Sequence, residues 1–182
     1  MTVVLGQHFM EGVAVMADCR ASISKSGKVT PWRDNTQKVF FLNSEIVLGF
    51  AGDIGFAGSI ISFVSHHMAT KPEFGQPHVF SKKAPSVFKY AYKKLCEQTG
   101  SKPGIAFIIA GNDLSRKQKV VDKDGKFTGY VNFTEKIVFK MSAPDFVPEF
   151  ASMAKPNVII GSGTPGLEEI EKDLFNLQFN VN

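Results

Sequence analysis

The sequence has few cysteines, no long hydrophobic run and no strong excess of charge of either sign. Its 182 residues contain only two cysteines, Cys19 and Cys96, which lie far apart and lack CxxC spacing. This usage fits a reduced intracellular protein better than a disulfide framework, and we interpret both residues as small buried apolar groups. The adjacent His66 and His67 cannot share one face of a helix, which argues against a metal site there.

No stretch approaches the roughly 18 apolar residues of a membrane-spanning helix, and the N-terminus has no basic segment followed by a long apolar one. These absences argue against a membrane span and a signal peptide, and they favour a cytoplasmic location. The net charge is only +4, although lysines cluster between Lys82 and Lys102, where Glu97 is the only acid. We interpret this cluster as a solvated helix face and expect no nucleic-acid partner.

The length and the 43% hydrophobic content predict one domain over residues 1–182, with a substantial core. Apolar runs of strand length and runs with helical spacing are separated along the chain, which favours an α+β fold over alternating βαβ units. We divide the domain into residues 2–53 with N-terminal strands, 54–100 with two helices, 104–163 with further strands, and 164–182 with a C-terminal helix.

Individual elements follow from periodicity and from turn residues. Strands are predicted at residues 2–7, 13–18, 38–42, 46–51, 104–110, 137–141 and 157–160. Residues 21–35 form a loop or an irregular hairpin, and residues 117–133 form a hairpin around an Asp-Gly turn. One helix runs from residue 54 to about 68, and a second begins between Ser81 and Pro85 and ends near Gly100. A third begins at Thr164 and Pro165, which suit an N-cap and a first helical position.

Thr2 carries both a hydroxyl and, once Met1 is removed, a free α-amine. An α-amine titrates at a pKa of about 7.7–8.0, so it can act as a general base for its own hydroxyl near neutral pH. Lys38 would supply a cation that favours the alkoxide, while the N–H of Gly52 would stabilise an oxyanion. Asp18, at the end of an apolar strand, requires a partner, and either Arg20 or Lys38 could serve.

Five short motifs carry these residues in order: Thr2–Val4, Ala17–Ser22, Gln37–Val39, Gly49–Asp53 and Ile160–Gly163. Together they resemble the proteasome β-subunit and HslV peptidase family of N-terminal-nucleophile (Ntn) hydrolases. The resemblance covers roughly residues 2–70 and returns near residue 161. It implies a four-layer αββα sandwich, assembly into homo-oligomeric rings, and chemistry without a metal or organic cofactor.

The resemblance also assigns roles to individual residues. It implies that Thr2 is the nucleophile, that Asp18 and Lys38 form its charge pair, that Gly52 is the oxyanion donor, and that Ser162 supports the threonine amine. Relative to the family, we expect the fold to be shortened at its C-terminus, since no counterpart of the later helix and strands follows. The hairpin around Asp122–Gly125 is expected to be an insertion.

A specificity pocket follows from the same resemblance. The matching positions are Ala21, Thr36, Phe40, Phe50 and Ile54, which would form a narrow apolar slot for a small or medium apolar residue. The alternative interpretation is that these side chains belong to the core.

The sequence therefore predicts a threonine-type endopeptidase that cleaves peptides or unfolded proteins through an acyl-threonine ester, with an unfoldase as a partner. Two alternatives remain open. One is a catalytically silent, ring-forming subunit, and the other is an Ntn amidase or transpeptidase acting on a different substrate.

Overall fold

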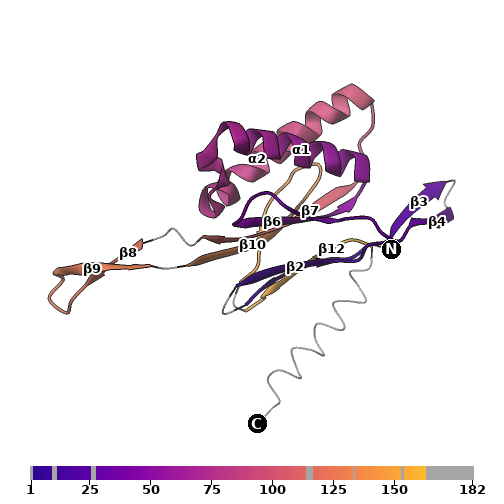
Figure 1. Ribbon diagram of the computed structural model, residues 1–182. Helices are drawn as coiled ribbons and strands as arrows, with labels where there is room; N and C mark the ends of the chain where they lie inside the picture. Colours follow the sequence, from indigo (N-terminus) through magenta and orange to yellow (C-terminus); the bar gives the residue numbers. More distant parts are fainter. Residues whose placement is uncertain are drawn as a thin grey trace, which may run out of the picture.

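The computed structural model describes residues 2–9, 12–25, 28–113, 117–132, 134–152 and 154–162. Two antiparallel sheets face each other, and two helices cover the outer face of the larger sheet (Figure 1). These are three layers of the predicted αββα sandwich. The helix predicted to begin at Thr164 lies outside the described residues.

The smaller sheet has the strand order β12-β1-β2, formed by β12 (Asn157–Ile160), β1 (Val4–His8) and β2 (Val13–Ala17). In the centre, Val4 of β1 pairs with Ala17 on one side and with Ile160 on the other. This register aligns the residues that precede β1 with those that follow β2 and β12. Thr2, Asp18 and Gly161 therefore meet at one edge of the sheet.

The larger sheet has the strand order β11-β10-β7-β6-β5. Its strands are β5 (Val39–Phe41), β6 (Ile46–Gly52), β7 (Ile105–Asp113), β10 (Glu135–Ser142) and β11 (Glu149–Phe150). The predicted strands are confirmed, whereas the two-residue β11 is too short to leave a sequence signal. Because Val39 pairs with Gly49, Lys38 lies next to the C-terminal end of β6.

The two sheets pack through buried aliphatic side chains from both inner faces, among them Val4, Ile108, Val138 and Ile160. Gly49 permits a close approach at this point, since a Cβ there would lie 2.6 Å from Cγ1 of Val4. The start of β1 is thereby held directly against β6. This contact brings the start of β1, and with it Thr2, close to β6 and to Lys38, which lies beside β6.

The helical layer consists of α1 (Ile54–Thr70) and α2 (Pro77–Thr99), joined by the short 3₁₀ helix η1 (Pro72–Gly75). A phenylalanine-rich core fills the space between this layer and the larger sheet, with Phe80, Phe88, Phe107 and Phe146 fully buried. Asp53 caps α1 by accepting a hydrogen bond of 2.9 Å from the N–H of Phe56. No helix within the described ranges is long and apolar enough to cross a membrane.

The predicted start of the second helix is wrong, because α2 begins at Pro77 rather than between Ser81 and Pro85. Pro77 occupies the first turn, where a missing N–H costs nothing. His78 then ties this turn to the end of β7 through a 2.5 Å contact between Nδ1 and Oδ2 of the fully buried Asp113. Pro85 lies inside the helix, held there by the packing of this face against the sheet.

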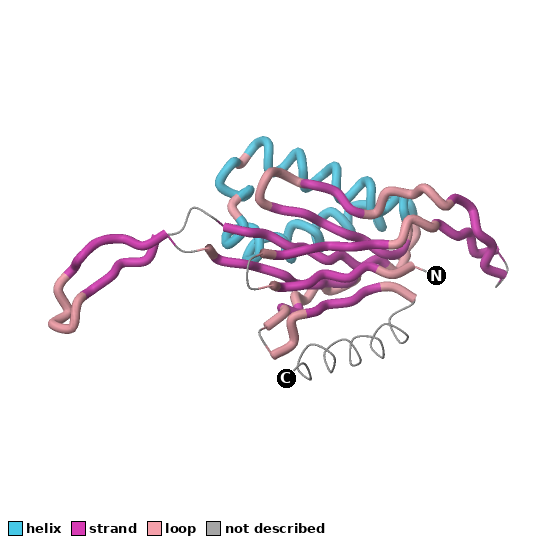
Figure 2. Tube along the Cα trace, turned by 60° about the horizontal axis from the view of Figure 1, so that its bottom comes forward, coloured by secondary structure: helices cyan, strands magenta, loops and turns pink. Residues whose placement is uncertain are grey.

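Two hairpins project from opposite ends of the sandwich (Figures 1 and 2). One is formed by β3 (Ala21–Lys25) and β4 (Lys28–Arg33), in the segment predicted as a loop or an irregular hairpin. The other, formed by β8 (Lys117–Val121) and β9 (Phe127–Asn132), confirms the predicted Asp-Gly hairpin. Gly125 adopts a φ of 75° in its turn, a conformation that favours glycine.

Candidate active site

Thr2 lies just ahead of β1, where the ends of β2 and β12 meet it. Its backbone N–H donates a hydrogen bond of 3.0 Å to Oγ of Ser162. The chain reaches Ser162 through Gly161, whose φ of +112° favours glycine and whose Cβ, if present, would lie 2.0 Å from the carbonyl oxygen of Thr2. The strand end at Gly161 thus fits closely against the Thr2 backbone, which leaves space only for glycine.

Lys38 stands immediately before β5 and is 4% exposed. Its ammonium donates to Oγ1 of Thr2 at 3.2 Å, to Oδ1 of Asp18 at 2.9 Å, and to the carbonyl oxygen of Arg20. An ammonium has three protons, so these three acceptors satisfy it completely. The cation is therefore held at a fixed position beside the threonine hydroxyl.

Asp18 is held by both backbone and side-chain donors. Its Oδ1 accepts from the N–H of Val3 at 2.9 Å, and its Oδ2 accepts from the N–H of Arg20 at 3.3 Å. Burial by itself raises the pKa of this carboxyl, but the bond from Val3 and the hydrogen bond and charge of Lys38 outweigh burial and hold the pKa below its ordinary value. Asp18 is therefore a carboxylate at neutral pH, as the ion pair with Lys38 requires.

The structure decides which cation pairs with Asp18. Lys38 forms the ion pair, whereas the guanidinium of Arg20 points to the exposed Asp34, with Nε 2.7 Å from Oδ1. Of the two partners left open by the sequence, Lys38 is therefore the one that pairs with Asp18, and only the backbone of Arg20 contacts Asp18 and Lys38. These contributions of Val3 N–H, Arg20 N–H and Arg20 carbonyl were missed, since a backbone group has no sequence signal.

Gly52 ends β6, the strand next to Lys38, and pairs with Ile105 of β7. Its φ is +113°, and a Cβ at this position would lie 2.3 Å from the carbonyl oxygen of Gly104. Both the conformation and the close approach require glycine at the turn from β6 into α1. Its assignment as oxyanion donor remains a prediction.

The residues predicted to line a specificity pocket fall into two groups. Phe50 is 2% exposed and belongs to the main core, and the partly buried Phe40 stacks against it at 6.2 Å between ring centroids. Ala21 is buried at the start of β3, Thr36 is half-buried, and Ile54 is 37% exposed in the first turn of α1. Ile54 is therefore the member of the set that solvent reaches most easily.

The arrangement suits nucleophilic chemistry at the Thr2 hydroxyl. A buried cation 3.2 Å from Oγ1 stabilises negative charge that develops on that oxygen, because the site has a lower dielectric constant than water. The carboxylate of Asp18 keeps the cation charged and oriented. Within the described residues, no three His, Cys, Asp or Glu side chains gather in a way that could hold a metal ion.

Two packed antiparallel sheets, with a threonine, a buried lysine and an aspartate at one edge, define an α+β sandwich of the Ntn-hydrolase class. A model of the proteasome subunit family matches residues 2–134, so the chain belongs to that family. The resemblance found in the sequence is confirmed. No curated protein sequence matches significantly.

Solved structures share this fold. The Anbu Gly-1 mutant from Hyphomicrobium sp. strain MC1 superimposes with a TM-score of 0.61 over 93% of this chain, at 17% identity. Anbu from Yersinia bercovieri, described as an ancestral beta-subunit, gives 0.58 over 93% at 15% identity. Eukaryotic HslV from Trypanosoma brucei gives 0.50 over 88% of this chain and 72% of its own length, at 14% identity. The chain spans 66% and 63% of the lengths of the two Anbu structures.

Proposed function

We propose that this protein is a threonine-type endopeptidase in which Thr2, once Met1 has been removed, is the nucleophile. The observation that carries the proposal is the contact of the buried Lys38 ammonium with Oγ1 of Thr2, at 3.2 Å, beside the Asp18 carboxylate that neutralises the cation. Burying a charged lysine costs free energy unless a partner compensates the charge. Groups buried and paired in this way are frequent at functional sites.

In the first half of the reaction, the freed α-amine of Thr2 takes the proton from its own hydroxyl. Oγ1 then attacks the carbonyl carbon of the scissile peptide bond, and the carbonyl oxygen becomes an oxyanion. The C–N bond breaks, the amine product leaves with a proton from the Thr2 ammonium, and an acyl-threonine ester remains. In the second half, the amine activates a water molecule, whose attack on the ester releases the acid product and restores the hydroxyl.

Three groups around Thr2 would support these steps. Lys38 stabilises the developing alkoxide, and Ser162, whose Oγ lies 3.0 Å from the Thr2 nitrogen, orients the amine that acts as the base. The N–H of Gly52 would donate to the oxyanion, an interaction whose loss costs about 3–4 kcal/mol in the barrier.

The substrate would be a peptide or an unfolded protein segment with a small or medium apolar residue before the scissile bond. Ile54 and Thr36 would contact that residue, while Ala21 and the stacked pair of Phe40 and Phe50 would close the slot from behind. As the family resemblance implies, copies of the chain would form a homo-oligomeric ring that encloses the sites. An unfoldase would then deliver the substrate.

A matched pair of substitutions tests the nucleophile. Thr2→Ser retains the hydroxyl and the amine, whereas Thr2→Val has nearly the same shape but no hydroxyl. We expect hydrolysis of apolar fluorogenic peptides by the wild type and by Thr2→Ser, and none by Thr2→Val, with the same assembly size for all three. Hydrolysis by purified Thr2→Val at the wild-type rate would overturn the proposal.

The same assays separate the alternative functions. A processed wild-type chain that cleaves nothing and reacts with no active-site probe would indicate a silent ring-forming subunit. An amidase or transpeptidase would react with the probe at Thr2 but would release ammonia or transfer the acyl group to an added amine instead of hydrolysing internal peptide bonds.

A further inference from the structure

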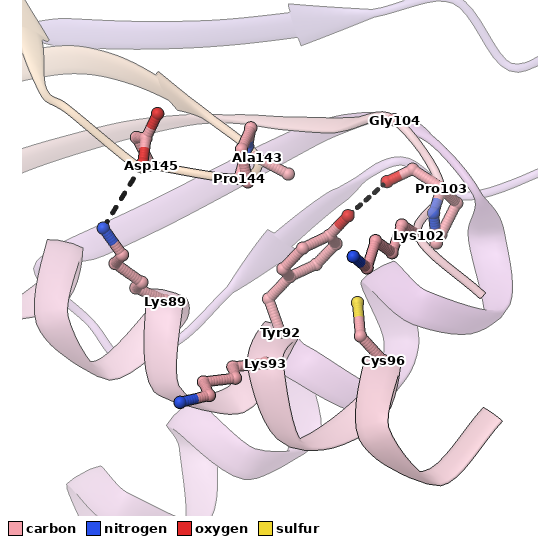
Figure 3. A pocket seen from close by; sticks show the side chains of 10 residues that line it. All are labelled: Lys89, Tyr92, Lys93, Cys96, Lys102, Pro103, Gly104, Ala143, Pro144 and Asp145. Carbon is pink, nitrogen blue, oxygen red and sulfur yellow. Dashed lines mark hydrogen bonds and ion pairs between the residues drawn. The ribbon is translucent and has the colours of Figure 1, made fainter. Parts of the chain in front are cut away.

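A cavity of about 440 Å³ lies between the second half of α2, the segment that follows it, and the turn after β10 (Figure 3). Its lining is mostly apolar and comes from Tyr92 and Cys96 of α2, Pro103, Ala143 and Pro144. The volume falls within the range of about 300–1,000 Å³ that small-molecule sites occupy. Thr2, Asp18 and Lys38 do not line it, so it is separate from the proposed active site.

The floor of the cavity is closely packed and hydrogen-bonded. Tyr92 is 7% exposed, and its ring packs against Phe146 and Phe56 at centroid distances of 5.6 and 6.0 Å. Its hydroxyl donates a hydrogen bond of 3.1 Å to the carbonyl oxygen of Pro103 (Figure 3). Since burial and the neighbouring Cys96 thiol raise the pKa of Tyr92, the hydroxyl keeps its proton for this bond. A site formed in advance loses little entropy when a ligand binds.

The rim of the cavity is positively charged. Lys89, Lys93 and Lys102 surround it, and Lys89 pairs with Asp145 at 3.3 Å. Lys93 and Lys102 have no acidic partner in the described part of the chain. Figure 3 shows the Lys102 side chain directed towards Tyr92 and Cys96, over the apolar floor, whereas the Lys93 side chain is directed away from them. The basic cluster that the sequence suggested to be a solvated helix face therefore has one part that borders a cavity.

We propose that this cavity binds an amphiphilic monocarboxylate, such as a medium-chain fatty acid, with its chain on the apolar floor and its carboxylate at the Lys102 ammonium, which lies over that floor (Figure 3). A ligand without an apolar part, such as inorganic phosphate, would leave the apolar floor uncovered and therefore fits this cavity poorly. The floor also presents few groups that could hydrogen-bond a sugar or a base. This site would be additional to the proposed peptidase activity and does not depend on it.

The prediction that both cysteines are buried is wrong for Cys19, which is exposed. Cys96 therefore provides a reporter inside the cavity, and Cys19 provides an internal reference outside it. The experiment measures the rate of alkylation of each thiol by iodoacetamide, by peptide mass spectrometry, with and without octanoate below its micellar concentration. We expect octanoate to slow the alkylation of Cys96 severalfold and to leave Cys19 unchanged. Octanol, which lacks the charge, and acetate, which lacks the chain, should protect weakly or not at all.

Variants then test the charges. Lys102→Gln should weaken octanoate binding about three- to tenfold, since exposed ion pairs contribute modestly. Lys82→Gln with Lys83→Gln, on the same helix but outside the cavity, should bind like the wild type. Calorimetric titration with octanoate gives the affinities independently of thiol reactivity. No measurable heat and no protection of Cys96, or equal protection by octanol, would overturn the proposal.

Discussion

The ammonium of Lys38 lies 3.2 Å from the hydroxyl oxygen of Thr2, although 36 positions separate the two residues in the chain. The contact joins the two sheets, because Lys38 precedes β5 of the larger sheet and Thr2 precedes β1 of the smaller one. It exists only when the sandwich is fully packed. The proposed chemistry of this protein depends on this contact between layers.

Removing the charge of Lys38 tests the electrostatic part of the proposal. Lys38→Met keeps a side chain of similar length and should lower kcat by about 10²–10³-fold, the usual cost of losing a preorganised charge-stabilising group. Steady-state hydrolysis of an apolar peptide measures the effect, and Lys82→Met on the exposed face of α2 is the control. A Lys38→Met enzyme with full kcat would contradict the role given to the ammonium.

The pH dependence of stability reports on Asp18. Its pKa is lowered in the folded protein, so it contributes stability that is present above the unfolded pKa of about 3.9 and is lost as the pH falls through the folded pKa. Denaturant midpoints measured from pH 7 to pH 2.5 should fall more steeply for the wild type than for Asp18→Asn. Asp145→Asn, in an exposed ion pair, should follow the wild type. Parallel curves for wild type and Asp18→Asn would refute this interpretation.

Gly161 provides a test of the fit between β12 and the nucleophile. Gly161→Ala places a Cβ only 2.0 Å from the Thr2 carbonyl oxygen, in a backbone conformation with φ of +112°, so we expect lower stability and loss of hydrolysis. Gly58→Ala is the matched control, because the helical Gly58 has open space around its Cα and should gain about 0.5–1 kcal/mol. Thermal unfolding and peptide assays follow both variants. Equal behaviour of the two variants would exclude a special role for Gly161.

The projecting hairpin of β8 and β9 should be dispensable for folding of the domain. Its strands pair with each other, while β7 and β10 remain paired along their lengths as far as Asp113 and Glu135. Replacing residues 114–134 with an Asn-Gly turn should leave the melting temperature of the domain nearly unchanged. Loss of cooperative unfolding in this variant would show that the hairpin stabilises the sandwich.

The sequence was most informative where the hydrophobic pattern and the final burial agree. The strands at residues 13–18, 46–51 and 157–160 and the first helix were predicted closely, because each is an apolar run whose period matches its element. Gly100 was recognised as a helix end, and it adopts the left-handed conformation that suits a glycine cap.

Other features could not be read from the sequence because tertiary packing decides them. Pro85 looked like a helix start, yet the burial of Phe80, Ala84 and Phe88 on one face of α2 outweighs the cost of about 3 kcal/mol for a proline inside a helix. The choice between Arg20 and Lys38 as the partner of Asp18 depended on the path of the β3–β4 segment. That path directs Arg20 to Asp34.

The proposed chemistry requires Thr2 to become an exposed, reactive N-terminal nucleophile. The most direct measurement is the intact mass of the purified protein before and after incubation with a β-lactone inhibitor, with Thr2→Val treated in parallel. We predict that the wild type loses one methionine and gains one inhibitor adduct, and that Thr2→Val gains no adduct. A wild-type mass that retains Met1 and gains no adduct would contradict the claim and favour a silent, structural subunit.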